Sequence, residues 1–489
     1  MTRLRLRALL AGAALGAALL LAPVAARADA AADFAAGAGA FQDGRYDLAV
    51  GLYTSVIRSG ELRGEALANA LYNRGLAYER LGEGAKALAD YQVFRTLQPA
   101  DPDGADRVAS VAVGLKLFAD ARPALEFLME RHPDATLRKR WEIIQVARAD
   151  QLAGRWAEAE QLLGRYARVD GRDNPVRLAR ARSAAAMGRK REALDLIRAI
   201  DNQYTLVLVR ADKGFESLWN DPEFIVATDL RTHFQRETAR LEREVRRSPD
   251  RLAPVVGWMG ALRRSGALGY AQIIGEDAMA LLGQFVDRQD YEVWLHNEVA
   301  LVALLLGDVA GAERAYRFGI DSLGMTNVDA VNLLLNGGMF LARETTKYRD
   351  ALDFATQAER LGTSPFGQMI ARGIRVAAYA GLNRPAELER AVSDMLRTVS
   401  DNAEEVIDAL LIAGRNDEAA RVVAAQLADP ASVDVTLLAL QRIVERPPSM
   451  RPVGQVVDSG WEGLRGDPRV LAALARVGRI TEVFATTAY

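Results

Sequence analysis

The stretch that decides the fold is Leu71-Tyr72-Asn73-Arg74-Gly75-Leu76-Ala77-Tyr78, which is followed at fixed spacings by Gly82, Ala87, Tyr91 and Pro99. A glycine ends a helix readily because it adopts the left-handed C-cap conformation at little cost. An alanine five residues later lets a second helix cross the first closely. Aromatic residues at helical spacing fill the layer between units. The stretch therefore predicts a hairpin of two helices.

The same spacing of glycine and alanine recurs along the chain. A period of roughly 34 residues is typical of solenoids, and we count about ten units, of which two keep only an alanine, Ala124 or Ala351. The residues expected to pack the first two units are Gly44, Tyr46, Ala49, Tyr53, Gly75, Tyr78, Gly82, Ala87, Tyr91 and Pro99. The later pairs are Gly154 and Ala159, Gly188 and Ala193, Gly266 and Ala271, Gly307 and Ala312, Gly381 and Ala386, and Gly414 and Ala419.

The run from Leu71 through Tyr91 to Pro99 resembles the tetratricopeptide repeat family. The resemblance implies an all-α fold, a right-handed superhelical solenoid of helical hairpins whose first helices line a concave surface for peptides or partner helices. On that surface it places the candidate ligand contacts Asn69, Asn73, Arg80 and Asn297. Phe34 and Ala38 stand where carboxylate-binding members of the family have basic and amide side chains, which argues against recognition of a C-terminal carboxylate.

Two segments interrupt the period, so we expect two arrays joined by an irregular segment. Residues 211–224 precede a charged stretch, Thr228 to Arg247, that predicts one long salt-bridged helix. Residues 461–470 repeat the pattern of a large apolar residue followed by Asp-Pro. We expect Trp219 and Trp461 to cover the last helix of an array. The predicted organisation is a signal peptide at 1–28, an N-terminal array at 29–200, a linker or capping segment at 201–250, a C-terminal array at 251–430 and a capping region at 431–489.

The N-terminus has the three parts of a secretory signal. Arg3, Arg5 and Arg7 precede an apolar run from Ala8 to Ala22, and Ala26-Arg27-Ala28 fits a signal-peptidase site. The signal predicts a periplasmic protein, with secretion as an alternative and an uncleaved membrane anchor as another. Beyond the signal, no apolar stretch approaches the roughly twenty residues of a membrane span, so the mature chain is not expected to cross a membrane.

Composition excludes several function classes. The chain has no cysteine, which removes disulfides and thiolate chemistry. Without the four arginines of the signal, 58 basic and 64 acidic residues remain, a formal charge of −6 that does not suit nucleic acid. The three histidines, His132, His233 and His296, are not at the spacing of metal ligands. We therefore expect no catalytic residues, no metal and no cofactor.

These observations favour an exported scaffold that mediates protein–protein interaction in the cell envelope. Its partners would be proteins or peptides, with an envelope polymer as an alternative. A scaffold subunit of a polysaccharide-export or outer-membrane assembly machine is the second hypothesis. The third is a cryptic envelope enzyme, which the scarcity of clustered titratable groups disfavours.

Overall fold

The computed structural model describes residues 29–324, 327–444, 449 and 451–483. The signal peptide expected at 1–28 lies outside these residues. The chain divides into two compact units, Met1–Met187 and Gly188–Tyr489. The division falls earlier than the joint expected at 201–250, which lies inside the second unit.

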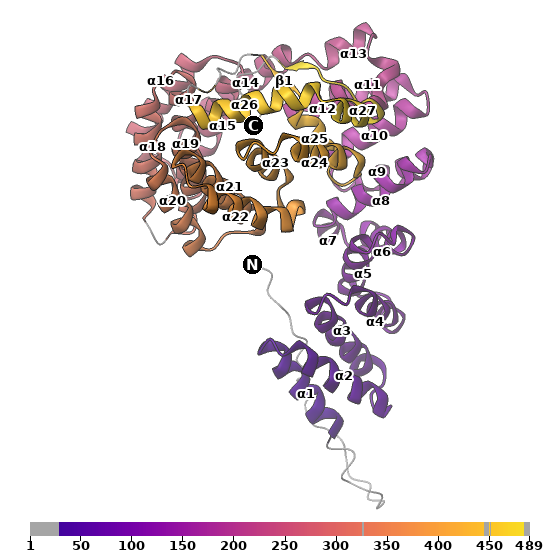
Figure 1. Ribbon diagram of the computed structural model, residues 1–489. Coiled ribbons are helices and arrows are strands. Elements are labelled where there is room, and N and C mark those ends of the chain that lie inside the picture. Colours follow the sequence, from indigo (N-terminus) through magenta and orange to yellow (C-terminus); the bar gives the residue numbers. More distant parts are fainter. Residues whose placement is uncertain (1–28, 325–326, 445–448, 450, 484–489) are drawn as a thin grey trace, which may run out of the picture. The chain divides into compact units, whose positions relative to one another are not determined.

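The first unit consists of helices only, within its described residues, and pairs of consecutive helices form four hairpins (Figure 1). Each hairpin has a first and a second helix, and the short α7 precedes the fourth hairpin. The helices are α1 (Asp29–Gln42), α2 (Tyr46–Ser59), α3 (Gly64–Arg80), α4 (Gly84–Leu97), α5 (Pro102–Gly114), α6 (Phe118–Arg131), α7 (Pro133–Leu137), α8 (Arg140–Leu152), α9 (Trp156–Tyr166) and α10 (Asn174–Ala186).

The second unit begins with α11 (Lys190–Arg198), which follows the turn at Gly188. The next helices depart from the repeat, namely α12 (Gln203–Ala211), the 3-10 helix η1 (Lys213–Leu218), α13 (Pro222–Ala227) and α14 (Leu230–Arg247). Five hairpins follow. Their helices are α15 (Leu252–Arg264), α16 (Leu268–Ala280), α17 (Arg288–Leu305), α18 (Val309–Leu323), α19 (Ala330–Glu344), α20 (Tyr348–Leu361), α21 (Pro365–Gly381), α22 (Pro385–Met395), α23 (Ala403–Ile412) and α24 (Asn416–Ala428). Two further 3-10 helices, η2 (Leu282–Gln284) and η3 (Leu396–Asp401), lie between them.

The chain after the last hairpin forms α25 (Val433–Ala439), α26 (Pro452–Gly466) and α27 (Pro468–Val477). Two short parallel strands, β1 (Arg442–Ile443) and β2 (Glu482–Val483), pair beside them. The described chain is therefore all-α apart from this small sheet, and the expectation of an all-α solenoid of tetratricopeptide-type hairpins is confirmed. The handedness of the superhelix stays a prediction.

Seven of the expected glycines occupy the left-handed conformation between two helices, with φ between 72° and 83°. In every case the alanine five residues later is completely buried. The second helix can approach the first closely there because alanine has only a methyl side chain. The seven pairs are Gly44 and Ala49, Gly82 and Ala87, Gly154 and Ala159, Gly188 and Ala193, Gly266 and Ala271, Gly307 and Ala312, and Gly414 and Ala419.

The pair Gly381 and Ala386 was predicted wrongly. Gly381 is the last residue of α21, and the left-handed residue of that hairpin is Asn383, with φ 53°. Asparagine tolerates this conformation better than most residues because its side chain hydrogen-bonds locally. Gly381 is needed for space instead, since a Cβ there would lie 2.2 Å from the Tyr348 ring.

The third hairpin turns without a glycine. Lys116 takes the left-handed conformation, with φ 60°, and the alanine five residues later is Ala121. Ala121 is completely buried. The predicted Ala124 is also buried, but it lies one helical turn further along α6.

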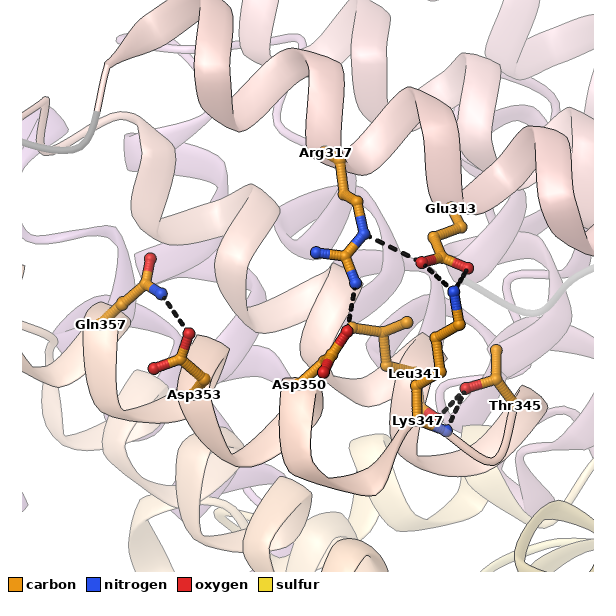
Figure 2. Close-up of polar contacts among 8 residues, drawn as sticks. All are labelled: Glu313, Arg317, Leu341, Thr345, Lys347, Asp350, Asp353 and Gln357. Carbon is orange, nitrogen blue, oxygen red and sulfur yellow. Dashed lines mark hydrogen bonds and ion pairs between the residues drawn. The ribbon is translucent and has the colours of Figure 1, made fainter.

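The hairpin of α19 and α20 replaces the glycine by a threonine turn, which Figure 2 shows. The Thr345 hydroxyl donates to the Leu341 carbonyl at 2.6 Å and accepts from the Lys347 amide at 3.0 Å. These bonds satisfy a helix C-terminus and a helix N-terminus together. Ala351 is completely buried, as expected.

Ion pairs join this hairpin to the preceding one (Figure 2). Glu313 on α18 accepts from Lys347 Nζ at 2.6 Å and from Arg317 Nε at 2.9 Å. Arg317 also bonds to Asp350 on α20. The two cations hold the pKa of Glu313 below its usual value, although partial burial raises it.

First helices of neighbouring hairpins contact one another in the second unit, from α15 through α17, α19 and α21 to α23 (Figure 1). Contacts also join α1 to α3, and α5 through α8 to α10, in the first unit. We call these rows the inner rows, because helices on the inner side of a curved array lie nearer one another than those outside.

Both interruptions of the period are helix starts that share one cap. The Asp221 and Asp467 side chains accept from the amides two and three residues later, and a proline follows each aspartate. Proline at the first helical position loses no hydrogen bond and has the required φ. The similar phrases therefore start α13 and α27.

The beginning and the end of the second unit contact each other. Arg479 donates from its backbone amide to the Ala211 carbonyl at 2.8 Å and from Nε to the Arg210 carbonyl at 3.0 Å. Its guanidinium lies 4.0 Å from the centroid of the Trp219 ring. Trp219 thus packs against the C-terminal segment, whereas Trp461 packs against α23 of the last hairpin through Asp408.

Candidate functional site

Three of the four predicted ligand contacts lie on α3 of the first unit. Asn69 and Asn73 are only 3% exposed, and Arg80 is exposed. Within the described part of the chain, Oδ1 of Asn69 and Nδ2 of Asn73 have no hydrogen-bond partner. Burial raises the pKa of Tyr53, on the neighbouring helix α2, to about 12. Both amides are therefore buried in the first unit, and their ligand role stays a prediction.

The fourth candidate, Asn297, is on α17 of the second unit and is 9% exposed. Its Oδ1 accepts from Nδ2 of Asn336 on α19 at 2.9 Å. This bond ties two neighbouring first helices. The structure does not bring the four candidates together in one unit.

Charged side chains bridge neighbouring first helices in the first unit. Lys139, at the start of α8, donates to Asp106 Oδ2 at 3.0 Å and to Ser110 Oγ at 2.6 Å on α5. Arg107 on α5 lies 3.6 Å from Glu79 on α3. Lys139 is only 6% exposed, so its ammonium is stabilised by these partners in place of water. The contacts fix the inner row of this unit as a preorganised surface.

Two tryptophans stand exposed on first helices at the same position of the repeat. Trp141 on α8 is 55% exposed and Trp294 on α17 is 42% exposed. Each lies thirteen residues before a turn glycine, Gly154 or Gly307, as Asn69 does before Gly82. Exposed tryptophans are frequent anchors of protein interfaces because they bury a large area on binding. The sequence analysis missed both, although counting back from the turn glycine would have found them.

The inner row of the second unit holds the chain's own helix α26. This helix contacts the first helices α19, α21 and α23 of the last three hairpins (Figure 1). Its buried side chains form one stripe at helical spacing, whereas Gln455, Val456 and Ser459 are exposed. The buried stripe consists of Val453, Val457, Trp461 and Leu464.

Polar side chains lie under α26 as well. Trp461 Nε1 donates to Asp408 Oδ1 at 2.7 Å, and Arg343 Nη1 lies 2.8 Å from Asp408 Oδ2. Glu405 lies 3.5 Å from Arg343. Burial raises the pKa of Glu405 to about 8; Arg343 opposes the rise, and Asp408 adds to it by repulsion.

Two of the three histidines lie beside a glutamate of their own helix. His296 is 1% exposed, lies 3.6 Å from Glu292, and burial lowers its pKa. Burial also lowers the pKa of His233, which lies 3.8 Å from Glu237. Among the described residues, no group of three or more histidine, aspartate and glutamate side chains could hold a metal ion. In the same residues, no helix has both the length and the apolar character needed to span a bilayer.

Comparison with known proteins finds no matching family model. Among solved structures, the chain is similar to yeast Tom70, with 11% identity over 91% of this chain and 99% of that chain and a TM-score of 0.33. The Cut9–Hcn1 hetero-tetramer of the APC/C matches with 13% identity over 90% of this chain and 85% of that chain, TM-score 0.30. A tetratricopeptide repeat protein from Parabacteroides merdae matches with 13% identity over 63% of this chain and 99% of that chain, TM-score 0.28. The fold assignment above rests on the chain's own hairpins.

Proposed function

We propose that the protein is an exported scaffold of the cell envelope that binds a protein partner along the inner row of its first unit. The observation that carries this proposal is Trp141, which stands 55% exposed on α8 beside helices held by buried ion pairs. A rigid surface with a large exposed aromatic side chain loses little conformational entropy on binding. Export is supported by the signal pattern of residues 1–28.

The charged groups of the first unit fit a binding role because their contacts join neighbouring first helices. Lys139 contacts Asp106 and Ser110 across α8 and α5, and Arg107 contacts Glu79 across α5 and α3. The partner that fits is a peptide or helix with an apolar side chain for the Trp141 ring and polar groups around it.

Site-specific photo-crosslinking in living cells tests the binding surface. A photoreactive amino acid replaces Trp141 in one strain and Glu158, which is exposed on the second helix α9 of the same hairpin, in another. The proposal predicts a discrete protein adduct from position 141 and none from position 158. Equal adducts from both positions, or a polysaccharide in place of a protein, would contradict it.

A reporter fusion tests the export half of the proposal separately. A reporter enzyme that is active only outside the cytoplasm is fused to residues 1–40, with a matched fusion in which Leu19, Leu20 and Leu21 are replaced by aspartate. We expect activity from the first fusion alone. Activity from both fusions, or from neither, would contradict export by this signal.

A further inference from the structure

Helix α26 occupies a surface that the repeat leaves for other helices. Its contacts with α19, α21 and α23 cross three hairpins, and two glycines let it approach closely. A Cβ at Gly460 would lie 2.8 Å from the Leu411 side chain, and one at Gly454 would lie 3.1 Å from the Arg343 carbonyl. The segment is therefore seated as a ligand helix would be, with an apolar stripe inward and a polar face outward.

The sequence of α26 is a poor helix former. Three glycines, Gly454, Gly460 and Gly463, lie inside the helix, and Gly466 ends it. Glycine disfavours helix because it loses the most backbone freedom on folding. Gly463 has nothing within 4 Å of a Cβ built on it, so packing does not require that glycine. The segment is helical chiefly because it is docked.

Two carboxylates on the surface beneath α26 accept hydrogen bonds from neutral donors of the C-terminal segment. Glu344 accepts from the Ser449 hydroxyl at 2.8 Å, and Asp408 accepts from the Trp461 indole at 2.7 Å. Both donors are neutral. The cationic Arg465 of α26 donates instead to the carbonyls of Leu440 and Gln441. Arg343 on α19 lies within 4 Å of both Asp408 and Glu405.

We propose that α26 is a resident ligand of the inner row formed by α19, α21 and α23, and that a basic amphipathic helix of a partner protein replaces it there. Such a helix would keep an aromatic side chain at the position of Trp461. A lysine or arginine at the position of Ser449 would pair with Glu344, and an ionic hydrogen bond is stronger than one from a hydroxyl. The bound chain would release its own residues 452–466 from this surface. This proposal concerns the second unit and does not depend on the contacts of Trp141.

An engineered disulfide tests the exchange, since the natural chain has no cysteine. The Leu411→Cys/Gly460→Cys double variant of the full chain places two thiols where a Cβ at 460 would lie 3.0 Å from Leu411 Cγ. Oxidation locks α26 in place, and reduction releases it. The probes are fluorescein-labelled synthetic peptides of residues 449–466 with the natural sequence, with Ser449→Lys and with Trp461→Ala.

The proposal predicts that the natural peptide binds the reduced variant at least about tenfold more tightly than the oxidised variant, because the disulfide keeps α26 on the surface and blocks the peptide. The Ser449→Lys peptide should bind about threefold more tightly than the natural peptide, and the Trp461→Ala peptide at least about tenfold less tightly. Equal binding to both redox forms, or no binding to either, would overturn the proposal. A stable dimer on reduction would overturn it in favour of exchange between two copies.

Hydrogen exchange on the unmodified chain keeps the test decisive if the double variant does not fold. We expect amides of α26 to exchange faster than those of α23, and the Ser449→Lys peptide to accelerate exchange in residues 452–466 while leaving α24 unchanged. Exchange of α26 as slow as that of α23, unaffected by the peptide, would show a permanent structural helix and would overturn the proposal.

Discussion

The indole Nε1–H of Trp461 donates to Oδ1 of Asp408 at 2.7 Å, and both side chains are buried. The other carboxylate oxygen of Asp408 is paired with Arg343. This relationship joins a residue near the C-terminus to the first helix of the last hairpin, across 53 positions of sequence. It is the polar contact by which α26 is positioned on the inner row.

Replacing Trp461 by phenylalanine should destabilise the protein by about 1.5–3 kcal/mol, because it removes a hydrogen bond to a charged acceptor and some buried area. Urea denaturation measures the change. Trp219→Phe is the matched control: the Trp219 Nε1 atom is buried without a hydrogen-bond partner among the described residues, so its loss should be close to neutral. Equal losses in the two variants would contradict the role of the bond to Asp408.

The stability of the protein should fall as pH rises from 4.5 to about 8, because Glu405 loses its proton in the folded state. Its folded pKa is raised from 4.5 to about 8, chiefly by burial, against the attraction of Arg343 and with repulsion from Asp408 and Glu404. The folded state then holds more protons than the unfolded state across that window, so the free energy of unfolding decreases with pH and levels off above it.

Urea midpoints across this pH range measure the Glu405 effect. The Glu405→Gln variant should show a flatter profile than the natural chain between pH 4.5 and about 8. Glu313→Gln is the control of opposite sign, because the folded pKa of Glu313 is lowered. Burial raises that pKa, but the hydrogen bonds and charges of Lys347 and Arg317 lower it by more. That variant should retain the fall. A profile unchanged in Glu405→Gln would contradict the prediction.

Two glycines in neighbouring hairpins should respond oppositely to alanine. A Cβ at Gly75 would lie 2.6 Å from the buried ring of Tyr91, so Gly75→Ala should cost about 1–3 kcal/mol. A Cβ at Gly51 meets nothing within 4 Å, and Gly51→Ala should stabilise by about 0.5–1 kcal/mol because alanine is the better helix former. Thermal melts of both variants measure the two changes in stability. The same sign in both would show that the hairpin packing is misassigned.

The left-handed turn residues give a further prediction. Lys116 has φ 60°, a conformation that costs a residue with a Cβ about 1–2 kcal/mol. Lys116→Gly removes this cost but gives the unfolded chain more conformational entropy, which opposes the gain. The net effect should be a rise in stability of about 0.5–1 kcal/mol. Gly82→Ala, at φ 75°, should lower it by about 1–2 kcal/mol. Denaturant midpoints test both, and a loss in Lys116→Gly would contradict the assigned turn.

Trp141→Ala should separate binding from folding. The side chain is 55% exposed, so we expect a stability change within about 0.5 kcal/mol. Affinity for the crosslinked partner should fall by about tenfold or more, since an aromatic anchor is lost. Val93→Ala, at an exposed position on the second helix α4, is the control that should bind normally. Normal binding by Trp141→Ala would exclude Trp141 as an anchor.

The hairpins could be predicted from the sequence because their determinants are local. A left-handed glycine such as Gly154 and a small residue such as Ala159 lie within one turn of the same unit, and their spacing survives in most units. Lys116 and Asn383 were missed because residues other than glycine can adopt the same conformation when the surrounding helices compensate for its cost.

The seating of α26 could not be predicted, since it depends on contacts between distant parts of the sequence. Trp461 was expected to cover the last helix of an array, and nothing local indicates that its helix spans three hairpins. The ligand contacts were predicted from the alignment to the repeat, which placed Asn69 and Asn73 on the first helix of the second hairpin without revealing their burial. The same register would have indicated Trp141.

Hydrogen exchange of the purified full chain, with and without the partner captured at position 141, is the decisive measurement for binding along the inner row of the first unit. We expect the partner to slow exchange in the first helices α3, α5 and α8 and to leave the second helices α4, α6 and α9 unchanged. Slower exchange in the second helices, with the first helices unaffected, would contradict binding along the inner row.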